Sequence, residues 1–282
     1  MTRLRKTARA KASTKGARAS AGTASRKKTA SRKKTVPAGR TASSSDEFGG
    51  FRPAARAFLR GLRRNNNREW FLANRDRYEA EVREPMRALV EELDVRLAAL
   101  APEIVGDPKR SMFRIHRDVR FSNDKSPYKT NAACWFYHMD AGRGVGSDAA
   151  HGGAGFYFDI GPDEAWVGGG IWMPPRPTLA RLREQIAEEH ASLTNVLRAP
   201  ALKPFGGLSR EAMLTRMPRG YDADHPAAEL VRHQSFTMGR EVRESDLFSA
   251  RLADVLAREF ERLVPLVRWL NGAMGLRTLA RR

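Results

Sequence analysis

The positive charge of this chain is distributed so unevenly that it limits where a folded core can lie. The formal net charge is +19, yet residues 1–45 carry 14 Lys and Arg with no Asp or Glu. The same segment repeats the hexapeptide ASRKKT at 24–29 and 30–35, among Ala, Ser and Thr. Such a segment cannot bury enough apolar surface to offset the entropy of ordering. We therefore predict a disordered basic tail over 1–47 and one folded domain over 48–282.

The rest of the chain is close to neutral, because it holds 37 basic and 32 acidic residues, a net charge of +5. The electrostatic case for a polyanionic partner therefore applies to the tail and not to the fold. Two roles fit the tail equally well, namely nonspecific binding of DNA or RNA through counterion release and a purely solubilising spacer.

Cysteine use and hydropathy limit the compartment. Cys134 is the only cysteine, so no internal disulfide can form, which fits a reducing compartment. No apolar run reaches the length that a membrane span needs, and the N-terminus lacks the apolar core of a secretory signal. We expect a cytoplasmic protein with no membrane partner.

Apolar residues recur at helical spacing at both ends of the chain. After Asp46 and Glu47, a first helix is predicted from about Phe51 to Leu62, and Asn65–Asn67 end it and cap a second helix that starts near Arg68 and continues past Pro85 to Ala101. Near the other end, helices are predicted over 177–197, over 210–215 and from Ser245 or Ser249 onward.

The middle of the chain has the period of strands. Residues 112–115 alternate, and the segments 132–137, 156–160 and 165–172 are rich in aromatic residues and bounded by Gly and Pro. Gly161–Glu164 is a good hairpin turn, 141–155 is a Gly-rich loop that includes His151, and 234–238 is a further extended segment. Helices at both ends and a mainly antiparallel sheet between them indicate an α+β fold.

The segment from Arg114 to Thr130 is the densest polar cluster outside the tail. On an extended chain Arg114, His116 and Asp118 share one face, whereas Arg117 points the other way. Beyond residue 45 the chain has 33 Arg but only four Lys, and two of these are Lys125 and Lys129, where a compact ammonium suits a close contact with an anion. The predicted ligand-binding residues are Arg114, Arg117, Arg120, Ser122, Lys125, Tyr128 and Lys129, with Asp118 and Asp124 as acid-base candidates.

The alternative is a salt-bridge lattice, in which Asp118 and Asp124 hold neighbouring Arg and Lys side chains and fix a loop on the sheet.

Other known motifs are absent or lack the flanking elements that they need. His116–Asn123 fits the catalytic-loop pattern of protein kinases, but no Gly-rich phosphate loop or strand Lys precedes it. No Walker loop is present, no spacing of Cys or His indicates a metal site, and no cofactor is implied. Gly168–Gly170, inside a strand, indicates a bulge or a close backbone approach, and that approach could be to a ligand.

Four motifs together resemble a known family. They are Asn-Asn-x-x-Trp-Phe at 66–71, Arg-Asp-x-Arg-Phe-Ser-x-Asp-Lys-x-Pro-Tyr-Lys-Thr at 117–130, Gly-Gly-Gly-Ile-Trp-x-Pro at 168–174 and Pro-Arg-Gly-Tyr-Asp-x-Asp-His-Pro at 218–226. This combination is similar to the bacterial and fungal domain of unknown function 2461, from about Phe51 to the C-terminus. The resemblance implies a single domain with a shared centre near Arg117–Lys129. It implies no reaction, substrate or cofactor.

Two functions follow as hypotheses. In the first, the domain binds a phosphorylated or carboxylated ligand through the Arg114–Thr130 motif, with or without acting on it. In the second, the protein associates with nucleic acid through its tail, and the motif is a structural lattice.

Overall fold

The computed structural model describes residues 48–120, 123–142 and 152–280. The chain divides into two units, Met1–Ala42 and Ser43–Arg282, and every element below belongs to the second. The predicted tail at 1–47, Ser122 and most of the predicted loop at 141–155, with His151, lie outside the described residues. No helix within the described ranges is long and apolar enough to cross a membrane.

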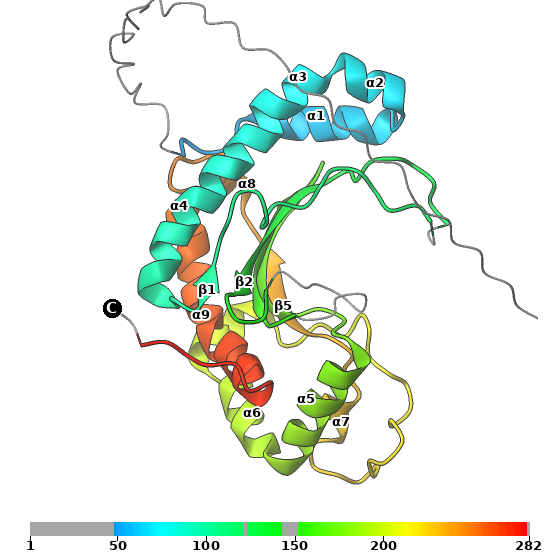
Figure 1. The fold of residues 1–282 in the computed structure, drawn as a ribbon, viewed down its shortest axis with the longest axis vertical. Coiled ribbons are helices and arrows are strands. Elements are labelled where there is room, and N and C mark those ends of the chain that lie inside the picture. The colour runs from blue at the N-terminus through cyan, green and yellow to red at the C-terminus, as the bar shows by residue number, and fades with distance from the viewer. Residues whose placement is uncertain (1–47, 121–122, 143–151, 281–282) are drawn as a thin grey trace, which may run out of the picture. The chain divides into compact units, whose positions relative to one another are not determined.

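The N-terminal helices form where the apolar spacing predicts them (Figure 1). They are α1 (Pro53–Arg64), α2 (Arg68–Ala73), α3 (Arg75–Tyr78), a π-helical turn η1 (Glu79–Arg83) and α4 (Glu84–Leu100). Asn67 caps α2, because its side-chain oxygen accepts a hydrogen bond of 2.9 Å from the backbone N–H of Trp70. Asn66 has a different role and holds another segment, described with the site.

Five strands form one antiparallel sheet in sequence order, which confirms the predicted α+β class. They are β1 (Ile104–Val105), β2 (Ala132–His138), β3 (Gly155–Ile160), β4 (Ala165–Ile171) and β5 (Phe236–Glu241). The predicted turn joins β3 to β4, where the backbone N–H of Gly161 donates to the carbonyl of Glu164 at 2.8 Å. The expected strand at 112–115 is not formed. Only single bridges, Met112 to Cys134 and His116 to Tyr128, mark this extended segment.

The C-terminal half returns to helices. These are α5 (Arg176–Glu188), α6 (His190–Leu197), a 3₁₀ turn η2 (Pro200–Phe205), α7 (Ala228–Val231), α8 (Glu244–Leu247) and α9 (Leu252–Ala273). The predicted helix at 210–215 is wrong. The segment makes one local turn, in which the backbone N–H of Met213 donates to the carbonyl of Arg210. The next N–H, that of Leu214, donates to the distant carbonyl of Arg232 and not to a residue one helical turn earlier.

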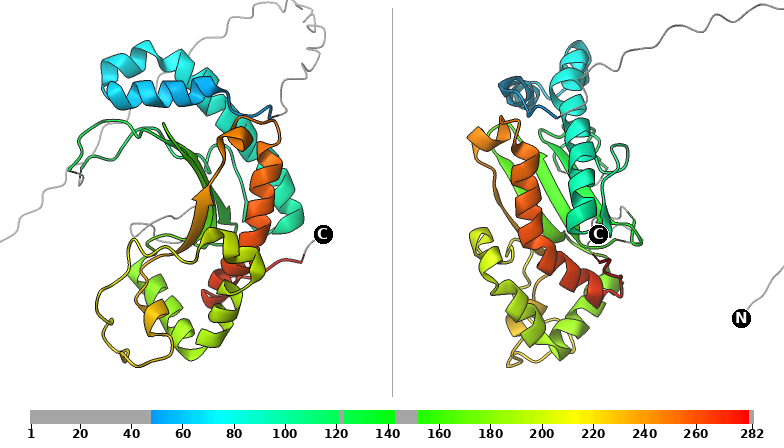
Figure 2. Two further views of the ribbon diagram at one scale, coloured as in Figure 1. Left: turned by 180° about the vertical axis from the view of Figure 1, so that it is seen from behind. Right: turned by 90° about the vertical axis from the view of Figure 1, so that its left-hand side faces the viewer.

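One face of the sheet is covered by helices. Figures 1 and 2 show α4 and α9 along the same side of the sheet. Phe260 of α9 stacks on Phe156 of β3 with ring centroids 4.8 Å apart, and both rings are fully buried, as is Phe136 of β2. Burying each such ring contributes on the order of 1.5–3 kcal/mol. This covered face is the core, and the opposite face of the sheet is left for the site.

Candidate functional site

Two hollows stand out among the described residues. The first, which we call the cleft, has a volume of about 780 Å³ and lies on the uncovered face of β2–β5. The second, the groove, has a volume of about 1510 Å³ and lies between α2–α4 and the residues 106–131 that connect β1 to β2. We call this connection the arm. Phe113 of the arm lines both hollows.

The arm contains the predicted charged motif. It is held in place by Asn66, whose side chain donates to the carbonyl of Tyr128 at 2.9 Å and accepts from its N–H at 3.1 Å. The ring of Tyr128 is buried and stacks on Phe71, with centroids 4.2 Å apart. Phe71 is therefore part of the core, and it also lines the groove.

The acidic residues of the motif are engaged by their neighbours. Arg120 makes a two-pronged ion pair with Asp118, at 3.0 and 2.7 Å, and Arg117 is paired with Asp124. The hydrogen bond from Arg120 lowers the pKa of Asp118 to about 2. Hydrogen bonding from Ser126, then the charge of Arg117, lowers the pKa of Asp124. A proton donor or acceptor works best with a pKa near the working pH, so this geometry does not favour acid-base chemistry here. The role of both residues stays a prediction.

The structure brings together only part of the predicted binding set. Arg114, Tyr128 and Lys129 line the groove. Lys125 donates to the carbonyl of Val119 at 2.9 Å and, like Arg117 and Arg120, lies on the arm outside both hollows. Ser122 lies outside the described residues.

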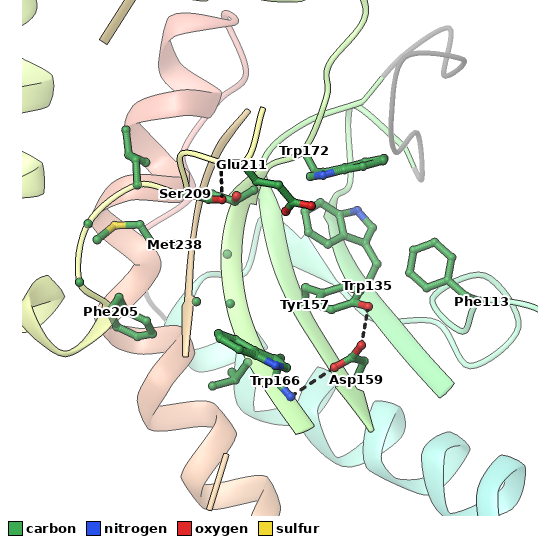
Figure 3. Close-up of a pocket in the computed structure, with 18 residues that line it drawn as sticks. Phe113, Trp135, Tyr157, Asp159, Trp166, Trp172, Phe205, Ser209, Glu211 and Met238 are labelled. Atoms are coloured by element: carbon green, nitrogen blue, oxygen red, sulfur yellow. Dashed lines mark hydrogen bonds between the residues drawn. The ribbon is translucent and has the colours of Figure 1, made fainter. Parts of the chain in front are cut away.

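The cleft is built by the alternation of side chains along the strands. Trp135 of β2 pairs with Tyr157 of β3, and Asp159 two residues further on pairs with Trp166 of β4. Because residues two apart on a strand share a face, these four side chains lie on the face opposite α9. Figure 3 shows them projecting from the strands into the cleft. An antiparallel sheet usually presents polar residues on its open face, so aromatic residues there indicate a binding surface.

Glycines on neighbouring strands leave part of the cleft lined by backbone alone. Gly168 of β4 pairs with Gly239 of β5, and both line the cleft. A Cβ atom at Gly168 would lie 2.7 Å from the carbonyl oxygen of Met238, so a side chain there would force the strands apart. The predicted close backbone approach is confirmed. The lack of side chains lets a ligand reach the level of the sheet.

Asp159 is the half-buried polar centre of the cleft. Its carboxylate accepts hydrogen bonds from the side chain of Asn131 at 2.8 Å, from the hydroxyl of Tyr157 at 3.1 Å and from the N–H of Trp166 at 3.2 Å. Burial raises the pKa of Asp159 despite these three donors, and burial also raises the pKa of Tyr157, which keeps its proton. A carboxyl group whose charged form is destabilised by burial, so that its pKa is raised, is typical of a functional position.

The indole nitrogen of Trp135 has no hydrogen-bond partner among the described residues, although only 5% of the residue is exposed. Buried donors without partners are rare in native proteins. Two further rings are unusually open, because Trp166 is 41% and Trp172 is 54% exposed. The wall of the cleft thus contains a buried donor with no partner among the described residues, beside broad apolar ring faces.

The charge of the cleft contrasts with that of the chain. Asp159 and Glu211 line it, but no Lys, Arg or His does so among the described residues. Within the same residues no group of three or more His, Cys, Asp or Glu could hold a metal ion.

Of the residues that line the cleft, the sequence pointed only to Gly168 and Gly169, as part of a close backbone approach, and not to the side chains. The available signal was the aromatic content of both strand faces, which includes Trp135 beside Phe136, together with an Asp at 159 inside an apolar strand. The cleft residues missed are Trp135, Tyr157, Asp159, Trp166, Trp172 and Glu211.

Comparison with known proteins gives one match. A family model described as "Conserved hypothetical protein (DUF2461)" matches residues 54–269, a range that contains every residue of the cleft and of the groove. No curated protein and no solved structure matches the chain.

Proposed function

The chain belongs to the DUF2461 family, and we propose that its domain binds a neutral, polyhydroxylated small molecule of the saccharide class in the cleft. The observation that carries this proposal is the buried N–H of Trp135, which has no partner among the described residues, in a cleft whose charged side chains are both carboxylates. A ligand that fits this cleft supplies an acceptor for that donor, and its own donors face Asp159 and Glu211. A hydroxyl group does both.

The ring faces supply the rest of the recognition. The exposed faces of Trp166 and Trp172 suit the apolar C–H face of a sugar ring, and a volume of about 780 Å³ lies within the usual range of small-molecule sites. The glycine floor at Gly168 and Gly239 leaves room for a flat ligand against the sheet.

Charge argues against two other ligand classes. A phosphorylated or carboxylated ligand would face two carboxylates and no basic side chain of the described residues. A quaternary ammonium ion would suit the aromatic rings and the acids, but it has no acceptor for the N–H of Trp135. A neutral ligand with hydroxyl groups suits the N–H of Trp135, the two carboxylates and the aromatic ring faces.

Two further proposals from the sequence concern the location of the protein and the role of its tail. A cytoplasmic location is supported by a single cysteine, Cys134, which lies fully buried in β2. Nonspecific nucleic-acid binding by the tail is supported by its 14 basic residues and lack of acids within 1–45.

Calorimetric titration of the full chain with neutral mono- to trisaccharides, the matching sugar phosphates and tetramethylammonium tests the proposal. We expect neutral saccharides to bind. The Trp135→Phe variant, which keeps an aromatic ring and removes the donor, should bind about tenfold or more weakly, because an acceptor of the ligand is left unmatched.

Trp269→Phe is the matched control. The indole of Trp269 donates to Ser192 at 2.8 Å and does not line the cleft, so this variant should bind as the unmodified protein does. Binding of tetramethylammonium or sugar phosphates in preference to neutral saccharides would overturn the proposal. So would an equal loss of affinity in both Trp variants.

A further inference from the structure

The groove has basic side chains on both of its walls. The helical wall provides Arg68, Arg75, Arg83 and Arg87, and the arm provides Lys109, Arg114 and Lys129. Only three acids line the same groove, namely Glu79, Glu91 and Asp107, so its lining has a net charge of +4. This charge is concentrated in a domain that carries only a small net charge overall.

Partners within the fold account for some of these cations and not for others. Arg83 is paired with Glu79 at 2.8 Å, and Arg87 lies between Glu84 and Glu91 at 2.8 and 3.1 Å. The side chains of four exposed residues make no hydrogen bond or ion pair within the described part of the chain: Arg68, Arg75, Lys109 and Arg114, of which Arg114 lies close enough to Asp118 to help lower its pKa. Like charges gathered around one hollow repel each other unless an anion lies between them.

We propose that the groove binds the phosphate backbone of single-stranded nucleic acid, as a site separate from the cleft. Two observations favour a polyanion over one phosphate group. The four cations are spread over both walls of the groove, two on the helices and two on the arm, and the volume of about 1510 Å³ exceeds that of usual small-molecule sites. Guanidinium groups match phosphate oxygens in two-pronged contacts, and three of the four cations are Arg.

A single strand fits the groove better than a duplex does. Proteins that bind single strands combine a basic groove for the backbone with aromatic rings on which bases stack. Phe113 and Tyr78, both half-buried, line the groove. The ammonium of Lys129 lies over the ring of Phe113, 5.0 Å from its centroid, in a cation–π contact. The basic tail of the same chain would add nonspecific affinity.

The test compares two fourfold variants of the full chain. The groove variant is Arg68→Gln, Arg75→Gln, Lys109→Gln and Arg114→Gln. The control variant is Arg216→Gln, Arg219→Gln, Arg258→Gln and Lys203→Gln, which removes the same charge from exposed positions outside both hollows. All eight side chains are exposed, so thermal melting should show both variants folded.

Fluorescence anisotropy with a labelled mixed-sequence single strand, measured over a series of salt concentrations, gives the readout. Each phosphate that is no longer neutralised should reduce the slope of log K against log salt by about 0.7, so the slope of the groove variant should fall by up to roughly 3. The control should keep the slope of the unmodified protein, and saccharide binding should be unchanged in both variants.

Three results would overturn the proposal. One is an equal slope change in both variants, which would show an effect of net charge alone. Another is an unchanged slope in the groove variant. The third is displacement of the strand by polyglutamate as readily as by polyphosphate of matched charge, which would show a site for acidic chains in general. Because the cleft is tested by neutral ligands and by Trp135→Phe, its failure would be seen separately.

Discussion

Replacing Trp135 by Phe should leave the protein as stable as before or make it more stable. Truncating a buried aromatic side chain normally destabilises a protein, but the indole N–H of Trp135 is a buried donor with no partner among the described residues. Removing a donor of this kind relieves a desolvation penalty of about 1–3 kcal/mol. The smaller ring leaves roughly 40 Å³ unfilled, which costs about 1 kcal/mol at some 24 cal/mol per Å³. The free energy of unfolding should therefore change by between about 0 and +2 kcal/mol.

Urea unfolding, followed by far-ultraviolet circular dichroism, measures this difference. Trp269→Phe serves as the comparison, because it removes a donor that is used, to Ser192, and should lower the free energy of unfolding by about 1 kcal/mol. If Trp135→Phe instead loses more than about 2 kcal/mol, the indole N–H is satisfied in the free protein. The main support for a ligand in the cleft would then be removed.

Three further predictions concern stability. Asn271→Ala should lower the free energy of unfolding by about 2–5 kcal/mol in urea, because it leaves both the N–H and the carbonyl of Ala154 buried without the partner that now holds them at 2.8 and 3.1 Å; an effect below 1 kcal/mol would contradict this. Arg268→Met should cost about 3–5 kcal/mol, since Glu103, only 1% exposed, would lose its ion pair at 2.7 Å; a melting temperature equal to that of the unmodified protein would refute it. Burial raises the pKa of Asp159 in the folded state, so the folded chain binds this proton more tightly, and its stability should fall as the pH rises from the unfolded pKa through the folded one. In calorimetric melting between pH 3 and 8, Asp159→Asn should lack this fall in stability and should melt at a higher temperature than the unmodified protein near pH 7. Parallel pH profiles of the two proteins would contradict the raised pKa of Asp159.

The parts of the fold that could be predicted are those with a strong periodic pattern. The helices α1 and α9 bury apolar residues at helical spacing, and the strands β2, β3 and β4 are short aromatic-rich runs bounded by Gly and Pro, which the sequence reveals. The two-residue strand β1 and the turn at 210–215 depend on pairing with distant residues, which local spacing does not record. Elements held by long-range contacts were therefore missed or misassigned.

The candidate site was harder to predict, for a related reason. Charged residues close together in the sequence drew attention to the arm, yet Asp118 and Asp124 are engaged by Arg120 and Arg117 there. The cleft draws its residues from strands far apart in the chain. Trp135 and Phe136 are neighbours of similar type, and only the position of α9 decides which of the two faces the core and which faces the cleft.

The most direct test of ligand binding in the cleft is to follow the indole N–H signals of the five tryptophans by ¹⁵N–¹H nuclear magnetic resonance. The Trp135 signal is assigned by its absence in Trp135→Phe. On saturation with a neutral saccharide, it should move downfield as the N–H gains an acceptor, while the signal of Trp269, which already donates to Ser192, should stay in place. A Trp135 signal that does not move at saturation would contradict the account.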